Sequence, residues 1–545
     1  MNGLKRFFGN AALLTLSALI MRSISVSFSA YVSNTAGAEA MGLFGQIMSV
    51  FGFALTLATS GVNLAVTRMI SEALGQLDEG LVHKSMHKCL GYCLICSLLS
   101  GGILFLFARN IGIYILKDER TIFSLKILAA ALPFISITSA FNGYFTAVRR
   151  VYKNTIYSIS EQLIKIYFTV KLFEIYIARG IEFACIAMIA ADAISEFSAF
   201  AMSALMYYFD KKRHIKNKVT SVSDSIVTKN LCLIALPIAF STYIRSGLLT
   251  IEHILIPRGL TKSGIGHSEA LASYGTLHSM VMPVVLFPTA VLSSFSGLLI
   301  PELAEAAVKK QKALVRSIAS RAFQFSLIFS IGIAGILICF SNELGIIIYD
   351  SYEVSKHIRL IAPLVPVMYL DSVTDAMLKG LGKQVYSMNV NIIDALLSII
   401  CVLILLPRYG IMGYVMTIYV TELINAALSV TKLLNVTELR PRILKWVIAP
   451  LISIISASSI TRLIFCCVQI SVSKTAEVVI NGLVMLFIYF MLIRLTRSIS
   501  KRDCIWLRHA LGIKRCSANR SCTRQDARKY SFPLTRERLS NTRKY

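Results

Sequence analysis

The chain contains fourteen long apolar stretches, and a polypeptide with this many can bury them only in a lipid bilayer. A membrane-spanning helix needs about 20 mostly apolar residues, and it satisfies its own backbone hydrogen bonds, which lipid cannot do. Of the 545 residues, 55% are hydrophobic and 16% are charged, and the mean hydropathy is +0.67. We therefore predict an all-α polytopic membrane protein with fourteen transmembrane helices. The predicted spans are roughly 8–31, 42–66, 89–110, 123–147, 155–178, 182–208, 231–256, 273–299, 319–341, 359–380, 386–406, 411–434, 444–469 and 476–496.

Lysine and arginine are concentrated in every second loop. The loops after the even-numbered spans are rich in them, as in 149–153 and 211–218, whereas the segment 34–39 after the first span has none. The positive-inside rule places the basic loops in the cytoplasm. We therefore predict a multi-pass protein of the bacterial cytoplasmic membrane with both termini in the cytoplasm. Because the net charge of +27 is distributed by membrane side, it does not indicate a nucleic-acid partner.

The composition changes abruptly after residue 500. Residues 501–545 contain thirteen lysines and arginines but only three acidic residues, with few apolar side chains. Such a segment cannot bury a hydrophobic core. We predict a disordered cytoplasmic tail that lies near anionic lipid headgroups.

Two arginines occur deep inside apolar stretches. Arg22 lies in the first predicted span and Arg245 in the seventh, each followed by serine. A cation at this depth costs roughly 2.5–3.5 kcal/mol on insertion scales unless it faces protein or water. One interpretation is an arginine that snorkels or pairs with a buried carboxylate for assembly only. The other is a water-filled cavity with a fixed positive charge on its wall.

The positions of these arginines suggest a repeat of six helices. A shift of 233 residues aligns Glu161 with Asp394, and a shift of 230 aligns Asp192 with Glu422. Because six is even, both repeats enter the membrane in the same direction, so a central cavity between two six-helix lobes is expected. The predicted domains are an N-terminal lobe (1–213), a C-terminal lobe (229–436), two additional helices (443–497) and the basic tail (501–545).

Further charged side chains offer partners for these groups. Glu161 and Lys165 are one helical turn apart and could form an ion pair within their helix. Glu252 lies two turns from Arg245 and could be its structural partner. We nevertheless count Lys165, with Arg22 and Arg245, among the candidate substrate-binding residues of the cavity.

Intramembrane acids are candidates for ion coupling or gating. Asp192 and Glu196 are one turn apart, and two carboxylates in a low dielectric tend to share a proton. A relay for H⁺ or Na⁺ is therefore one interpretation. The candidate residues are Glu161, Asp192, Glu196, Asp371, Asp394 and Glu422.

The sequence has no motif for enzymatic chemistry. It lacks a P-loop, an HExxH sequence and a nucleophile elbow. Cys89, Cys93 and Cys96 share a helical face, which could indicate a metal or redox site, but small soft residues at a helix interface are the simpler interpretation. We therefore expect no catalytic residues, no cofactor and no metal.

Several short segments resemble a known family. Residues 41–46 (MGLFGQ) and 56–62 (TLATSGV) are similar to the second-helix signature of the stage V sporulation protein B group. Residues 143–145 followed by 161–162 resemble its fourth-to-fifth helix pattern, and residues 371–373 with 379–384 (KGLGKQ) resemble its tenth helix. This group belongs to the superfamily of multidrug and toxin extruders, polysaccharide flippases and lipid II flippases. The resemblance covers about residues 1–496.

The resemblance implies a flippase for a polyprenyl-diphosphate-linked sugar, a peptidoglycan, spore-cortex or polysaccharide precursor. It also implies that Arg22 and Arg245 read the pyrophosphate, which agrees with the preference of arginine for such groups. A cation-coupled multidrug exporter of the same fold is the first alternative, but arginines in the cavity argue against organic cations. A non-transporting scaffold that assembles cell-wall synthesis proteins is the second. The expected partners are the lipid-linked sugar, membrane lipids and a coupling H⁺ or Na⁺.

Overall fold

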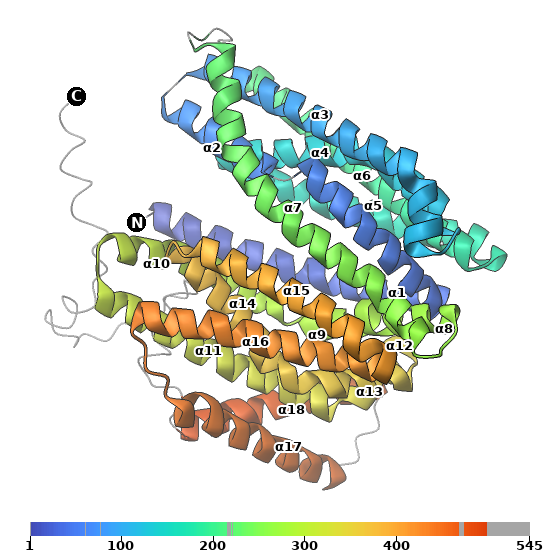
Figure 1. The fold of residues 1–545 in the computed structure, drawn as a ribbon. Helices are drawn as coiled ribbons and strands as arrows, with labels where there is room; N and C mark the ends of the chain where they lie inside the picture. Colours follow the sequence, from blue (N-terminus) through green and yellow to red (C-terminus); the bar gives the residue numbers. More distant parts are fainter. Residues whose placement is uncertain are drawn as a thin grey trace, which may run out of the picture. The chain divides into compact units, whose positions relative to one another are not determined.

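The structure is a computed structural model, and it describes residues 2–59, 61–76, 78–214, 220, 222–467, 474–496 and 498. The fold below is that of Leu13–Ser500, which forms one unit. All regular elements in the described ranges are helical (Figure 1). The tail predicted over 501–545 lies outside them.

The first half of the chain, as we call residues up to 214, contains helices α1 to α6. The first predicted span and most of the second lie in α1, where Gly37 has a non-helical backbone (φ 84°, ψ 166°) that glycine adopts without steric cost. The gap predicted between these spans is therefore a kink. The elements are α1 (Asn2–Thr59), α2 (Val62–Gly75), α3 (Glu79–Asn110) with η1 (Ile111–Leu116), α4 (Thr121–Ala147), α5 (Val151–Tyr176) with η2 (Ile177–Arg179), and α6 (Ile181–His214).

The second half, α7 to α16, begins with a long helix followed by a broken one. The apolar segment His267–Leu286 and its continuation Thr289–Ser296 meet at an angle of 57°. Pro288 lies at this break, and proline cannot donate a backbone hydrogen bond. The elements are α7 (Asp224–Lys262), α8 (His267–Gly275), η3 (Thr276–Val281), α9 (Met282–Leu286), α10 (Thr289–Val308), α11 (Lys312–Cys339), α12 (Ser341–Tyr349), α13 (Tyr352–Ile361), η4 (Ala362–Leu364), α14 (Val365–Gly380), α15 (Gln384–Tyr409) and α16 (Ile411–Thr437).

Two more helices follow the second half. They are α17 (Ala449–Cys467), preceded by η5 (Leu444–Ile448), and α18 (Lys474–Leu495). Both pack on α11 and on each other. They correspond to the additional pair of spans in the prediction.

The helices confirm an all-helical polytopic membrane protein. Among the described residues, eleven helices are long and apolar enough to cross a membrane, or twelve if the bent pair counts as one span. The difference from fourteen has two causes. The first two predicted spans are counted together as one candidate, Ile20–Gly75, and α5 is not counted because charged side chains such as Glu161 and Lys165 lower its hydropathy. The count falls from twelve to eleven when the bent pair is left out.

The same neighbours recur along the two halves. In the first half, α4 packs on α2, α3 and α6, and α5 packs on α6. In the second half, α14 packs on α10, α11 and α16, and α15 packs on α16. The two-lobe domain boundaries themselves remain a prediction.

The halves meet closely where α1 crosses α8. A Cβ atom at Gly42 would lie 2.0 Å from the backbone oxygen of Leu271, and one at Gly275 would lie 2.3 Å from that of Ala38. Only glycine permits these backbones to approach so closely.

We expect Gly42→Ala to destabilise the protein by about 1–3 kcal/mol, because the methyl group forces two backbones apart. Gly52→Ala is the matched control, since it lies on the same helix with nothing within 4 Å of the added atom. Thermal unfolding of the purified variants measures the difference. Equal unfolding temperatures for the two variants would show that the crossing is loose.

Candidate functional site

Arg22 connects the first half to the helix break in the second. Its Nη2 donates a hydrogen bond of 3.0 Å to the carbonyl oxygen of Leu286, the last residue of α9. The Thr289 hydroxyl donates to the same oxygen at 2.5 Å. Among the described residues, no carboxylate forms an ion pair with Arg22 within 4.0 Å. Among the described residues, Arg22 therefore pairs with a backbone carbonyl, and not with the buried carboxylate that one interpretation proposed.

Arg245 lies on the part of α7 that contacts α1. The Tyr243 hydroxyl donates to the Leu57 carbonyl at 3.2 Å, and the Ser246 hydroxyl donates to Thr56 Oγ1 at 3.0 Å. Arg245 itself is exposed. Both arginines therefore stand on helices that touch the opposite half, while their lining of one shared cavity stays a prediction.

Glu252 is not the partner that its position on α7 suggested for Arg245. Its Oε1 accepts a hydrogen bond of 2.5 Å from Ser398 on α15. The acid within electrostatic range of Arg245 is Asp394, also on α15. Helix α15 packs along α7, and this neighbour could not be identified from local spacing.

The first acid cluster, as we call Glu161, Lys165, Asp192 and Glu196, lies between α5 and α6. Lys165 forms an ion pair with Asp192, whose side chain is 11% exposed, and not with Glu161 on its own helix. Glu161 and Glu196 lie within electrostatic range of this pair. The predicted ion pair between Glu161 and Lys165 within α5 is therefore wrong, because Lys165 pairs with Asp192 on α6. The cluster contains three acids and one base.

The second acid cluster, as we call Asp371, Asp394 and Glu422, joins α14, α15 and α16. The three carboxyl groups interact electrostatically with one another. Asn425 donates to Asp371 Oδ2 at 3.4 Å. Within the described residues, Oδ1 of Asp371 and Oδ1 of Asp394 are buried without a hydrogen-bond partner.

The two clusters occupy matching depths. Glu161 and Asp394 each lie ten residues after the first residue of their helices, and Asp192 and Glu422 each lie eleven residues after theirs. At 1.5 Å per residue this is about 15 Å along the helix, near the middle of a hydrocarbon core about 30 Å thick. Under the same shift of 233, Lys165 corresponds to Ser398. The second cluster therefore lacks the lysine of the first.

A charged network links the halves at the ends of the helices. Arg120 contacts Asp118 at 2.6 Å and Glu39 at 3.0 Å, and the Ser268 hydroxyl donates to Glu39. His267 Nε2 lies 3.6 Å from Asp118. Burial raises the pKa of Asp118, but the hydrogen bond and charge of Arg120 outweigh it and hold that pKa below its ordinary value. These residues were not among the sequence candidates, because charged loop residues carry no distinctive spacing.

Comparisons with known proteins agree on the family and the fold. A family model described as "Polysaccharide biosynthesis protein" matches residues 7–307, and one described as "MatE" matches residues 260–404. Two relatives from Bacillus subtilis (strain 168) are similar in sequence. Stage V sporulation protein B is 25% identical over 444 residues, covering 79% of this chain and 85% of that one, and sporulation protein YkvU is 20% identical over 397 residues, covering 71% and 86%.

Solved structures with the same fold include two transporters. Lipid II flippase MurJ in an inward closed conformation has a TM-score of 0.65 at 15% identity, covering 92% of this chain and 99% of that one. An inward-facing multidrug resistance MATE transporter of the MOP superfamily has a TM-score of 0.61 at 15% identity, covering 78% and 99%. At this identity the likeness shows the fold alone.

Proposed function

The chain belongs to the polysaccharide biosynthesis protein family and is a transporter of the MOP superfamily, and from this premise we propose that it is a flippase for a polyprenyl-diphosphate-linked sugar. The head group would enter a cavity between the halves while the lipid tail stays in the bilayer. Alternating access would then move it to the outer leaflet. The family description and the sporulation relatives favour a peptidoglycan, spore-cortex or polysaccharide precursor.

The observation that carries this proposal is that Arg22 and Arg245 lie inside apolar helices without a carboxylate partner among the described residues. Each lies inside an apolar helix that touches the opposite half, and neither forms an ion pair within 4.0 Å among the described residues. A diphosphate suits such groups, because the planar guanidinium binds phosphate oxygens through two parallel hydrogen bonds. Lys165 is a weaker candidate for this contact, since Asp192 already neutralises it.

The proposed topology has fourteen crossings in the bacterial cytoplasmic membrane, with both termini in the cytoplasm. It treats the two parts of α1 on either side of Gly37 as separate spans and includes α5. The alternation of basic loops along the sequence supports it.

Cation-coupled drug export is the second candidate function. It is favoured by the excess of acids in both clusters and by the MatE match over residues 260–404. The clusters are also compatible with the flippase, in which they would accept the H⁺ or Na⁺ that drives transport. Substrate identity, and not the presence of acids, therefore distinguishes the two functions.

Reconstituted proteoliposomes test the proposal. Labelled lipid II and other polyprenyl-diphosphate sugars, placed in one leaflet, should reach the other faster than in protein-free vesicles, with or without an added Na⁺ or H⁺ gradient. An organic cation trapped in matched vesicles should not be exchanged. Movement of the cation but of no lipid-linked sugar would overturn the flippase and establish the exporter.

A further inference from the structure

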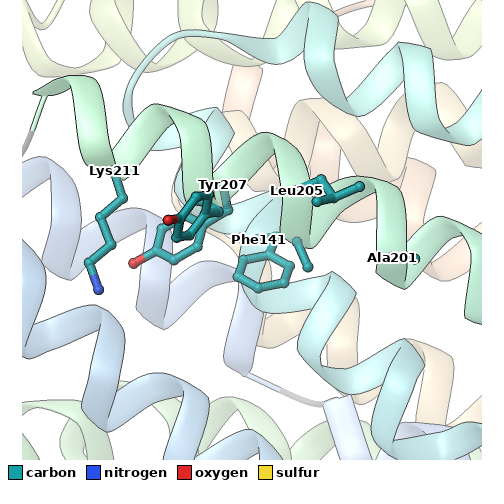
Figure 2. Close-up of a pocket in the computed structure, with 7 residues that line it drawn as sticks. Phe141, Ala201, Leu205, Tyr207 and Lys211 are labelled. Atoms are coloured by element: carbon teal, nitrogen blue, oxygen red, sulfur yellow. The ribbon is translucent and has the colours of Figure 1, made fainter.

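An open groove runs along the outside of α6. It has a volume of about 630 Å³ and lies against α4 (Figure 2). One wall residue comes from α4, and the others come from α6. The lining residues are Phe141, Ala201, Ala204, Leu205, Tyr207, Tyr208 and Lys211.

The groove has a fixed wall and a small-residue floor. The rings of Phe141 and Tyr207 are stacked with centroids 4.9 Å apart, and both side chains are buried. Two alanines leave room beside them. Leu205 and Tyr208, each 59% exposed, border the opening. An extended hydrocarbon chain would fit against this surface, because the groove contains no charged side chain except at one end.

That end is basic. Lys211 lies beyond the aromatic side chains in Figure 2, and the exposed Lys212 and Arg213 follow it. The preceding Asp210 is already engaged by Lys153 at 2.6 Å and by Arg150. Within the described part of the chain, Lys211 has no ion-pair partner within 4.0 Å, so its charge is free for an anion.

We propose that this groove is a binding site for one anionic phospholipid. Its acyl chain lies along Ala201, Ala204 and Leu205, and its phosphate contacts the Lys211 ammonium. A lysine with a long apolar stem places its charge at the headgroup level in this way, and tyrosine is favoured at the same depth. The end of α6 lies on the predicted cytoplasmic side, where anionic lipids are enriched. This site is separate from the arginines and acid clusters, and so it does not depend on the proposed function.

Lipid retention tests the site. The full-length chain is purified from micelles that contain phosphatidylglycerol and phosphatidylcholine in equal amounts, and native mass spectrometry counts the retained lipids. The wild type should retain phosphatidylglycerol preferentially. Lys211→Gln should reduce this preference about fivefold, as expected for one basic side chain at an anionic lipid surface. Lys212→Gln is the matched control, because Lys212 does not line the groove, and it should change the preference little.

Filling the groove provides an independent measurement. Ala204→Phe should remove one retained phospholipid per chain, with the elution profile and unfolding temperature showing that the variant is folded. Equal phosphatidylglycerol preference in the wild type and Lys211→Gln would overturn the proposal. An equal loss in Lys211→Gln and Lys212→Gln would do so too, because it would indicate a diffuse basic surface. If the wild type were a dimer and Ala204→Phe dissociated it, the groove would be a contact with a second copy of the chain and not a lipid site.

Discussion

Arg22→Ala and Arg245→Ala should each slow translocation of a polyprenyl-diphosphate-linked sugar by roughly tenfold to a hundredfold, the loss expected for charge-assisted hydrogen bonds worth about 1.5–3 kcal/mol. Each arginine contacts or adjoins the opposite half of the molecule. Removing either one would leave the diphosphate with a single guanidinium in a low-dielectric cavity. Proteoliposome translocation rates, at equal protein content, measure the effect.

Replacing Arg22 with lysine distinguishes the effect of the positive charge from the effect of the planar guanidinium. Arg22→Lys keeps a cation that can still donate to the Leu286 carbonyl, but it loses the planar fork that binds two oxygens. We expect a partial defect, smaller than that of alanine. If Arg22 only stabilised the helix break, Arg22→Lys would be as active as the wild type, and Arg22→Ala would have a lowered unfolding temperature.

The double variant tests whether both arginines bind one ligand. Two groups that share a ligand have coupled effects, so the double alanine variant should be little slower than the slower single one. If the fold-reductions in translocation rate of the two single variants multiplied in the double variant, the two arginines would act independently and would not bind one ligand together. Normal rates in both single variants, at equal membrane abundance, would refute the diphosphate site and favour the exporter.

The helices themselves were predictable from the sequence, because length and hydrophobicity determine which segments can cross a bilayer. The gap predicted between the first two spans corresponds to the kink at Gly37, which separates the two helical parts of α1. The angle of 57° at the break beside Pro288 was not predictable, because it depends on the helices that pack beside it.

The candidate site was predictable as a set of residue types but not as a set of contacts. The sequence showed which acids lie inside apolar stretches, where a charge is costly, and the structure places each of them in a long helix; their role in ion coupling or gating stays a prediction. Spacing could not give the partner of Lys165. Glu161 is one turn away on the same helix, yet Asp192 on the adjacent α6 forms the ion pair. In the same way, the Ser398 hydroxyl on α15 donates a hydrogen bond to Glu252, 146 residues earlier in the chain.

Asp394→Asn should abolish stimulation of transport by a Na⁺ or H⁺ gradient while leaving the protein in the membrane. Asp394 has a buried carboxylate oxygen without a hydrogen-bond partner among the described residues, and it lies within electrostatic range of two more acids and of only one base, Arg245. A cation or a proton would relieve that arrangement, whereas asparagine carries no charge and cannot take up a proton. The flux of a lipid-linked sugar with and without each gradient measures the loss.

Asp375→Asn is the matched control for this variant. Asp375 is also an acid of the second half, but it already has Lys379 as its own base at 2.6 Å and accepts from Ser387. A partly exposed pair of this kind contributes only about 0–1 kcal/mol, so the gradient response should persist.

Glu161→Gln, the corresponding change in the first half, should reduce transport more than expression. If Asp394→Asn and Glu161→Gln both vanished from the membrane while Asp375→Asn did not, the acids would be needed to hold the helices together, and coupling would have to lie elsewhere.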